Sequence, residues 1–277
     1  MNVLCYVNHY FGPPVGFEGR STDADADRRR AIVAACLDGL RALPGVDLKV
    51  CGIEGRALEG IDIDFSHIRN DPKLLVYESL AHMVRRSEDY DYCINIEDDI
   101  LLPPETLANV IEFDQESLLN EILHPNRVEE DESGRRFCVD LAAMPGWTYQ
   151  RRTYRGRELR VARNPHSALL ILSRDKLRYA LQHIDVSYRG RFLTYEMDSA
   201  LAYYLSPFCL YRPYEDLEFH TVTHLDRWAG SRRPPPAAPA APGAPVAVAA
   251  RRARPRWKSV AREIIPPILL RRRRRKG

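Results

Sequence analysis

Tyr92–Pro104 reads YCINIEDDILLPP and decides the fold of this chain. Its first five residues are β-branched, aromatic or small and mostly apolar, which is typical of a strand buried on both faces. Three acidic residues, Glu97, Asp98 and Asp99, follow this strand directly. Pro103 and Pro104 then interrupt the extended pattern and favour the start of a helix. The stretch therefore predicts a buried strand that ends in a cluster of carboxylates.

Strands and helices alternate on the N-terminal side of this stretch. The pattern predicts a strand over Asn2–Asn8, a helix from Thr22 or Asp23 to about Leu43, and a strand over Asp47–Gly52. A second helix is expected up to Arg86, with Asp71 as its cap and Pro72 at its first position. Such alternation indicates a parallel sheet with helices on both faces. Ligands bind to sheets of this kind beyond the carboxyl ends of the strands, where the acidic triplet lies.

The C-terminal side is less regular. We expect a helix from Pro104 to about Leu118, and then an irregular polar region over 120–163 with short strand-like pieces at Glu121–Arg127 and Phe137–Leu141. The later pattern predicts strands at Ala168–Leu172 and Cys209–Arg212, and helices at Leu177–His183 and Glu196–Leu205.

Charge divides the chain into unlike parts. The net charge of +3 combines a basic segment 231–277, with 14 Lys or Arg and one Glu, and a segment 1–230 with 27 basic and 37 acidic residues, a net charge of −10. Pro and Ala dominate 231–256, which is typical of a linker without a core. We therefore expect a folded domain over 1–230, a Pro/Ala/Arg-rich linker over 231–256, and a disordered, basic and amphipathic tail over 257–277.

The six cysteines are far apart and form no C-x-x-C pair, which excludes the usual zinc motifs. Several lie in apolar strands and are expected to be buried thiols in a reducing compartment. We see no signal peptide and no apolar run of the ~20 residues that span a bilayer. The expected location is the cytoplasm.

Three adjacent carboxylates are unfavourable unless a cation lies among them. Mg²⁺ and Mn²⁺ prefer oxygen ligands and are usually held by one or two carboxylates together with substrate phosphates. The alternative is that Asp98 and Asp99 only cap the turn before Pro103. Their position at the carboxyl end of a strand favours the metal.

The segment Tyr92–Pro104 resembles the D-x-D segment of GT-A glycosyltransferases, in particular family 2-like enzymes. The resemblance implies a GT-A-type, Rossmann-like mixed sheet and a nucleotide-diphosphate sugar as donor. It also implies Asp99 as a ligand of Mn²⁺ or Mg²⁺, and Glu97 as a partner of the donor ribose or of the metal. Asp98 would be a ligand or a supporting group. Glu replaces Asp at the first position of the motif.

Two later segments follow in the order that the resemblance implies. Tyr195–Ala200 (YEMDSA) leads into a helix, as does the segment that carries the catalytic base in inverting enzymes, so Asp198 is the expected base and Glu196 the alternative. Glu196 at a helix start could instead only stabilise the helix. The segment 224–228 (HLDRW) resembles the Q-x-x-R-W segment of processive members. Here His replaces Gln at the first position, and the resemblance implies Arg227 on the diphosphate and Trp228 on a sugar. His220 or His224 equally resembles the C-terminal histidine that completes the metal or diphosphate site in many GT-A enzymes.

The donor's base is expected at the other end of the chain. Asn8, His9 and Tyr10 follow the first strand, where the family holds the nucleotide, and Arg69 and Asp71 precede the second helix. His166 lies where the family places an acceptor-binding loop.

The tail places Trp257 and aliphatic residues beside an arginine run, which suits an anionic membrane surface. We therefore expect peripheral attachment to the inner face of the membrane, a glycan or lipid-linked acceptor, and no nucleic-acid partner. Two alternatives remain open. One is a nucleotidyltransferase on a similar sheet, although Phe11–Gly16 lacks the usual spacing of a phosphate loop. The other is a non-catalytic, membrane-tethered sugar-binding protein.

Overall fold

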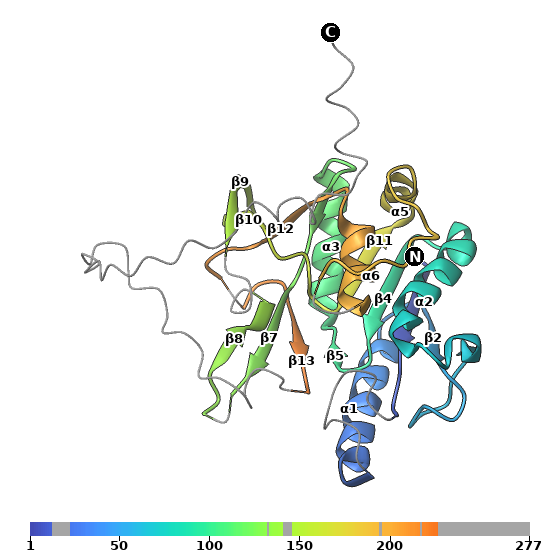
Figure 1. Ribbon diagram of the computed structural model, residues 1–277. Coiled ribbons are helices and arrows are strands. Elements are labelled where there is room, and N and C mark those ends of the chain that lie inside the picture. The colour runs from blue at the N-terminus through green and yellow to red at the C-terminus, as the bar shows by residue number, and fades with distance from the viewer. Residues whose placement is uncertain (13–22, 132, 141–145, 194–195, 217, 227–277) are drawn as a thin grey trace, which may run out of the picture. The chain divides into compact units, whose positions relative to one another are not determined.

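The computed structural model describes residues 1–12, 23–131, 133–140, 146–193, 196–216 and 218–226. This part of the chain is an α/β structure with mixed sheets and helices, shown in Figure 1. The expected linker over 231–256 and the tail over 257–277 lie outside the described residues.

The central sheet carries the acidic triplet. Its strand order is β11-β4-β1-β2-β3, and the strands span Val3–Asn8 (β1), Val46–Gly52 (β2), Ile63–Asp64 (β3), Tyr92–Glu97 (β4) and Leu169–Ser173 (β11). β1 lies between β2 and β4 and is parallel to both, with Asn8 opposite Glu97. The carboxyl ends of β1 and β4 therefore meet at the same edge, as the alternation of strands and helices predicts.

β11 runs antiparallel to β4, so the expectation of an all-parallel sheet was wrong at this edge and the expected mixed sheet was right. The backbone N–H of Glu97 donates a hydrogen bond to the carbonyl of Ala168 at 3.0 Å. Because β11 begins at this point, the loop that precedes it reaches the end of β4. The antiparallel strand thus brings the segment 164–168 to the acidic triplet.

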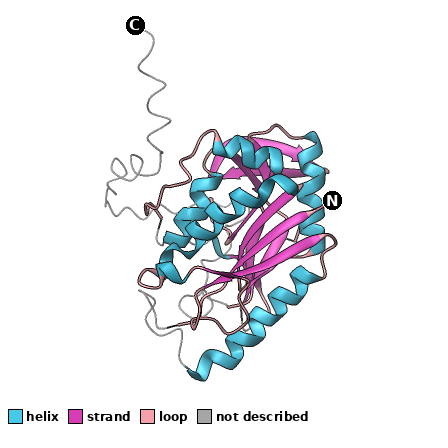
Figure 2. Ribbon diagram, turned by 90° about the vertical axis from the view of Figure 1, so that its right-hand side faces the viewer, coloured by secondary structure: helices cyan, strands magenta, loops and turns pink. Residues whose placement is uncertain are grey.

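Helices cover both faces of this sheet, as Figure 2 shows. Each of these five helices overlaps an expected helix, and α6 has the expected bounds. Their ranges are Asp23–Arg41 (α1), Leu75–Arg86 (α2), Pro104–Glu116 (α3), Arg174–Leu181 (α5) and Glu196–Leu205 (α6). The second helix differs at its start. Pro72–Leu74 forms a 3-10 turn, and the Asp71 side chain before it makes no capping hydrogen bond.

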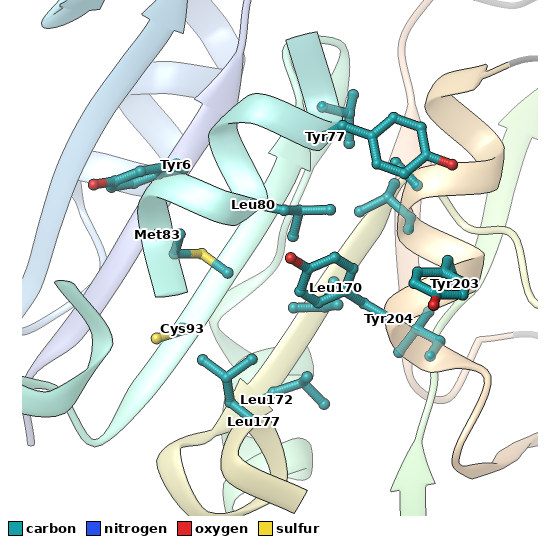
Figure 3. Packing of buried hydrophobic residues seen from close by; sticks show 14 of the residues in the cluster. Tyr6, Tyr77, Leu80, Met83, Cys93, Leu170, Leu172, Leu177, Tyr203 and Tyr204 are labelled. Carbon is teal, nitrogen blue, oxygen red and sulfur yellow. The ribbon is translucent and has the colours of Figure 1, made fainter. Parts of the chain in front are cut away.

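Alternate residues of β1 face different helices. Leu4 and Tyr6 pack in one buried cluster with side chains of α2, α5 and α6, whereas Val3, Cys5 and Val7 pack in another with side chains of α1 and α3. Figure 3 shows the first cluster, in which Leu80 of α2 lies among aromatic and aliphatic side chains of α6 and β11. Burial on both faces explains the continuous apolar sequence of these strands.

Two smaller sheets complete the described fold. One has the order β6-β12-β10-β9 and the other β5-β13-β7-β8. Their strands span Ile100–Leu101 (β5), Glu121–Leu123 (β6), Asn126–Glu130 (β7), Arg136–Cys138 (β8), Trp147–Tyr154 (β9), Arg157–Ala162 (β10), Cys209–Pro213 (β12) and Thr221–His224 (β13). The hairpin of β9 and β10 was not expected, because this region reads as irregular in the sequence.

The six cysteines are free thiols, and five of them are buried. Burial raises the pKa of Cys93 to about 12. The Cys93 thiol is therefore protonated at neutral pH, and the buried cysteines act as small apolar side chains, as expected.

Candidate active site

The acidic triplet lies at the turn that joins β4 to β5. Glu97 is the last residue of β4, and Asp98 and Asp99 are only 4 % and 8 % exposed. Buried carboxylates need cations or hydrogen-bond donors around them. The three side chains find different partners, so the triplet divides into separate positions.

Both oxygens of Asp98 are held by protein groups. Oδ2 lies 2.5 Å from Nδ1 of His9, and Oδ1 accepts a hydrogen bond from Nη2 of Arg29. Nε2 of His9 accepts the backbone N–H of Leu58 at 2.8 Å, so the proton of the ring lies on Nδ1 and is donated to Asp98. His9 therefore ties Asp98 to the loop that follows β2.

Asp99 lies between Arg29 and His224. Its Oδ2 accepts from Nη1 of Arg29 at 3.1 Å and lies 3.3 Å from Nε2 of His224, whereas its Oδ1 is buried and has no hydrogen-bond partner. Burial opposes ionisation of Asp99, but His224 and Arg29 outweigh it and hold the pKa of Asp99 well below its usual range. Asp99 is therefore an ionised carboxylate with one unused oxygen.

Strand register places His224 here. β13 pairs antiparallel with β5, with His224 opposite Ile100, and parallel with β7. Nδ1 of His224 lies 2.5 Å from Oε1 of Glu129, a β7 residue that is only 1 % exposed. Burial lowers the pKa of His224, but the charge of Asp99 and the hydrogen bonds to Asp99 and Glu129 outweigh burial and raise it to about 9. A carboxylate behind one ring nitrogen is the usual arrangement around a metal-binding histidine.

Glu97 belongs to a second group of side chains, with His166 and Asp198. One potential ligand atom from each of the three lies within 4.8 Å of the others. His166 comes from the loop before β11 and Asp198 from the first turn of α6, and Nε2 of His166 is 3.5 Å from Oδ1 of Asp198. Such a set of donor atoms can hold a divalent cation or transfer protons.

The two carboxyl groups of this second group have pKa values near neutrality. Burial raises the pKa of Glu97 to about 8, and the charges of Asp99 and Asp198 add to the effect. Burial also raises the pKa of Asp198 to about 7, against the opposing charge of Arg127. Burial, with Arg127 and Arg212 nearby, lowers the pKa of His166 well below its usual value, so His166 is neutral.

Buried arginines support this group. Nη2 of Arg127 donates to Oδ1 of Asp140 at 2.8 Å, and Nη1 of Arg212 lies 3.6 Å from the other oxygen of Asp140. Nη2 of Arg212, which is fully buried, donates to the carbonyl of His166 at 2.5 Å. The position of His166 is thus fixed through its backbone by a buried ionic network.

The residues expected around the nucleotide base lie in different places. The side chain of Asn8 is committed to Asn95 at 2.7 Å and to Ser79 at 2.5 Å in a buried polar network. Tyr10 is partly buried against the core cluster of α2. Arg69 is exposed and donates to the carbonyl of Glu54 at 3.0 Å, and Asp71 is also exposed. The structure does not bring Asn8 and Arg69 together.

Two further expected residues, Glu196 and His220, have partners outside the acidic triplet. Glu196 is 3.7 Å from the exposed Arg191, so its charge is partly neutralised at the surface. His220 directly precedes β13, the strand that His224 ends, and four residues of strand span about 13 Å. Its Nε2 donates to the carbonyl of Leu123 at 3.2 Å, and burial lowers its pKa to about 3. Arg227 and Trp228 lie outside the described residues.

Sequence reasoning missed Arg29, Glu129 and Arg127. Arg29 is one of three consecutive arginines in α1, and nothing in the sequence distinguishes it from Arg28 or Arg30. Glu129 and Arg127 lie in a region that was read as irregular. The available signal was an alternation of charged and apolar residues, Arg127, Val128 and Glu129, which is typical of a strand. It places the two charged side chains on one face of that strand.

Comparison with known proteins found no family model and no curated protein that matches the chain. Within the described residues, no helix combines the length and the apolar character needed to cross a membrane. The candidate site is therefore interpreted from its own chemistry.

Proposed function

We propose that this protein is a metal-dependent glycosyltransferase that moves a sugar from a nucleotide-diphosphate sugar to an acceptor hydroxyl. The observation that carries the proposal is the meeting of Asp99 and His224 at the carboxyl end of β4, with Glu129 behind His224. These residues come from strands far apart in the sequence, and the acidic motif and the histidine are the two metal-binding elements that the resemblance to GT-A enzymes implies.

The residues at Asp99 fit a divalent ion. The buried Oδ1 of Asp99 has no partner, and one oxygen of Glu97 is also buried without a partner. Carboxylate and imidazole ligands suit Mn²⁺, and carboxylates suit Mg²⁺. Asp99 and His224 would hold the ion, with Glu97 as a further ligand or as the ribose partner. The ion supplies positive charge that stabilises the leaving diphosphate.

Asp198 is the proposed general base. A base works best when its pKa lies near the operating pH, and burial places the pKa of Asp198 at about 7. His166, 3.5 Å away, orients this carboxyl group, since His166 is itself fixed by Arg212. Asp198 would take the proton of the acceptor hydroxyl as that oxygen attacks the anomeric carbon, which gives inversion.

An activity assay with a panel of nucleotide-sugar donors tests this proposal. Release of nucleoside diphosphate would be measured from a set of nucleotide sugars, with and without Mn²⁺, for the wild type and Asp99→Ala. We expect one donor to be consumed in a Mn²⁺-dependent reaction that Asp99→Ala reduces by about 10²-fold or more. Asp38→Ala is the matched control, because Asp38 is an exposed carboxylate of α1 that pairs with Arg41 in the same helix. Consumption of no donor under any condition would contradict the proposal.

The proposed acceptor is a glycan or a lipid-linked sugar, and the proposed location is the cytoplasmic face of a membrane. Both rest on the basic sequence 257–277, which suits anionic lipid. Co-sedimentation of the full chain with vesicles that contain anionic lipid tests this part. Equal sedimentation with neutral vesicles, or none with either, would contradict it.

A further inference from the structure

Arg29 is a cation built into the acidic turn. Its Nη2 donates to Oδ1 of Asp98 and its Nη1 to Oδ2 of Asp99 at 3.1 Å. The same Nη1 lies 3.6 Å from a carboxylate oxygen of Asp226, just beyond β13. Only 17 % of the Arg29 side chain is exposed. A single guanidinium from α1 therefore contacts three carboxylates from two other parts of the chain.

The two aspartates differ in what else holds them. Asp98 has both oxygens occupied, one by Arg29 and one by His9. Asp99 has Oδ1 buried and unpaired, and Arg29 and His224 share its other oxygen. Loss of Arg29 from Asp99 would thus leave that carboxylate facing His224 alone. The two side chains become a pair of metal ligands when Nε2 of His224 gives up its proton.

We infer that Arg29 is a resident counter-cation that neutralises Asp99 until a divalent ion binds, and that the ion displaces Arg29 from Asp99 while Arg29 keeps its bond to Asp98. This inference rests on the metal site of the proposed function. The physical reason is that a guanidinium and a divalent ion cannot both lie against one carboxylate without strong mutual repulsion. Arg29 therefore weakens the binding of bare metal.

Asp98 has a different role from Asp99 in this arrangement. Because Arg29 and His9 occupy different oxygens of Asp98, Asp98 anchors the guanidinium close to Asp99 rather than serving as a metal ligand. The acidic motif thus contains one aspartate for the metal and one for the arginine that competes with it.

Calorimetric titration of the metal-free full chain with Mn²⁺ alone tests the inference. We expect Arg29→Gln to bind Mn²⁺ about tenfold more tightly than the wild type, because the competing charge is gone. Arg28→Gln is the matched control. Arg28 is the preceding α1 residue, its side chain is 57 % exposed, and it contacts Asp226. The Arg28→Gln substitution removes the same charge at a neighbouring position and should change the Mn²⁺ affinity by less than about twofold.

A folded Arg29→Gln variant that binds Mn²⁺ with wild-type or lower affinity would overturn the inference and leave the proposed function standing. Absence of Mn²⁺ binding in both proteins would overturn the inference together with the proposed metal site. Asp98 without Arg29 is a buried carboxylate with one partner fewer, which can prevent folding. A second comparison avoids this problem. It sets the single variant Asp98→Asn against the double variant Asp98→Asn/Arg29→Gln, and the double variant should bind Mn²⁺ about tenfold more tightly than the single one.

Discussion

The carboxyl groups at the end of β4 differ in their immediate neighbours. Asp98 and Asp99 contact the guanidinium of Arg29, whereas Glu97 and Asp198 lie beside the neutral ring of His166. Opposite charge holds the pKa of Asp99 low, and burial raises the pKa of Asp198 to about 7. One part of the site is therefore suited to binding a cation and the other to exchanging a proton near neutral pH.

Asp198→Asn tests the role of the raised pKa. Turnover should fall by about 10²–10⁴-fold, while donor binding stays within a few fold of the wild type. The folded protein holds the Asp198 proton more tightly than the unfolded chain, so this carboxyl group costs stability as pH rises from about 4 to about 7. The variant should therefore be more stable than the wild type at pH 8, by about 4 kcal/mol in urea unfolding, and equally stable at pH 4. Full turnover in the variant would show that Asp198 is not the base.

Glu129→Gln tests the carboxylate behind His224. Loss of the negative charge should weaken Mn²⁺ binding by about 10–100-fold, the effect typical of groups that orient a metal-binding histidine. The measurement is Mn²⁺ titration calorimetry. Glu130→Gln is the control, because Glu130 is the next residue of the same strand and is exposed. Equal affinities in the two variants would indicate that Glu129 has only a structural role.

The sequence predicted the acidic triplet, Asp198 and His224 as site candidates, and the structure brings Asp99 to His224 and Glu97 to Asp198. Arg29 and Glu129 could not be predicted. Their places depend on which strands pair and in what register, and a shift of one residue in β7 would turn Glu129 to the opposite face.

Among the elements, α6 carries Asp198 and depends on α2 for its position. Tyr77 and Leu80 of α2 lie against Tyr203 and Tyr204 of α6 in the buried cluster of Figure 3. The ring of Tyr203 also stacks on Tyr188, with centroids 4.4 Å apart. Packing of α6 against α2 therefore helps to set the distance from Asp198 to the end of β4.

Leu80→Ala should lower the free energy of unfolding by about 2–5 kcal/mol, because the side chain is fully buried and its removal leaves a cavity. Chemical denaturation measures the change. Leu118→Ala is the matched control, since Leu118 is 67 % exposed, and it should cost less than about 0.5 kcal/mol. A similar small loss in Leu80→Ala would contradict the described packing.

Elements with a buried apolar face could be predicted, and those without one could not. Half of the residues of β9 are exposed, and they lie on both faces of the strand, so apolar and polar side chains do not alternate along its whole length. The turn that joins it to β10 has positive φ at Arg155 and Gly156, 49° and 72°. Such a turn is usually signalled by Asn-Gly or Asp-Gly, and Arg in place of Asn or Asp concealed it.

For the molecule as a whole, buried neutral histidines link stability to pH. His124, His166 and His220 are buried or nearly so, and burial lowers the pKa of each. As pH falls below about 6.5, the unfolded chain gains protons that the folded protein does not accept. Each such histidine therefore removes up to about 1.4 kcal/mol of stability per pH unit, down to its pKa in the folded state.

His220→Asn isolates one of these contributions. Asn tolerates the positive φ of 59° at this position and can donate to the carbonyl of Leu123. Between pH 6 and pH 4, the free energy of unfolding of the variant should fall less steeply than that of the wild type. The difference in slope corresponds to the uptake of up to one proton on unfolding. Urea unfolding at several pH values measures the slopes. The same flattening in His183→Asn, which changes an exposed histidine, would contradict the assignment to burial.

The most direct test of the central claim, a metal-dependent donor site at Asp99, is calorimetric titration with a panel of nucleoside diphosphates, with and without Mn²⁺, on the wild type and Asp99→Ala. We expect that one nucleotide binds, that its binding requires Mn²⁺, and that Asp99→Ala abolishes this binding. Nucleotide binding that is unchanged in Asp99→Ala, or binding of no nucleotide under either condition, would contradict the account.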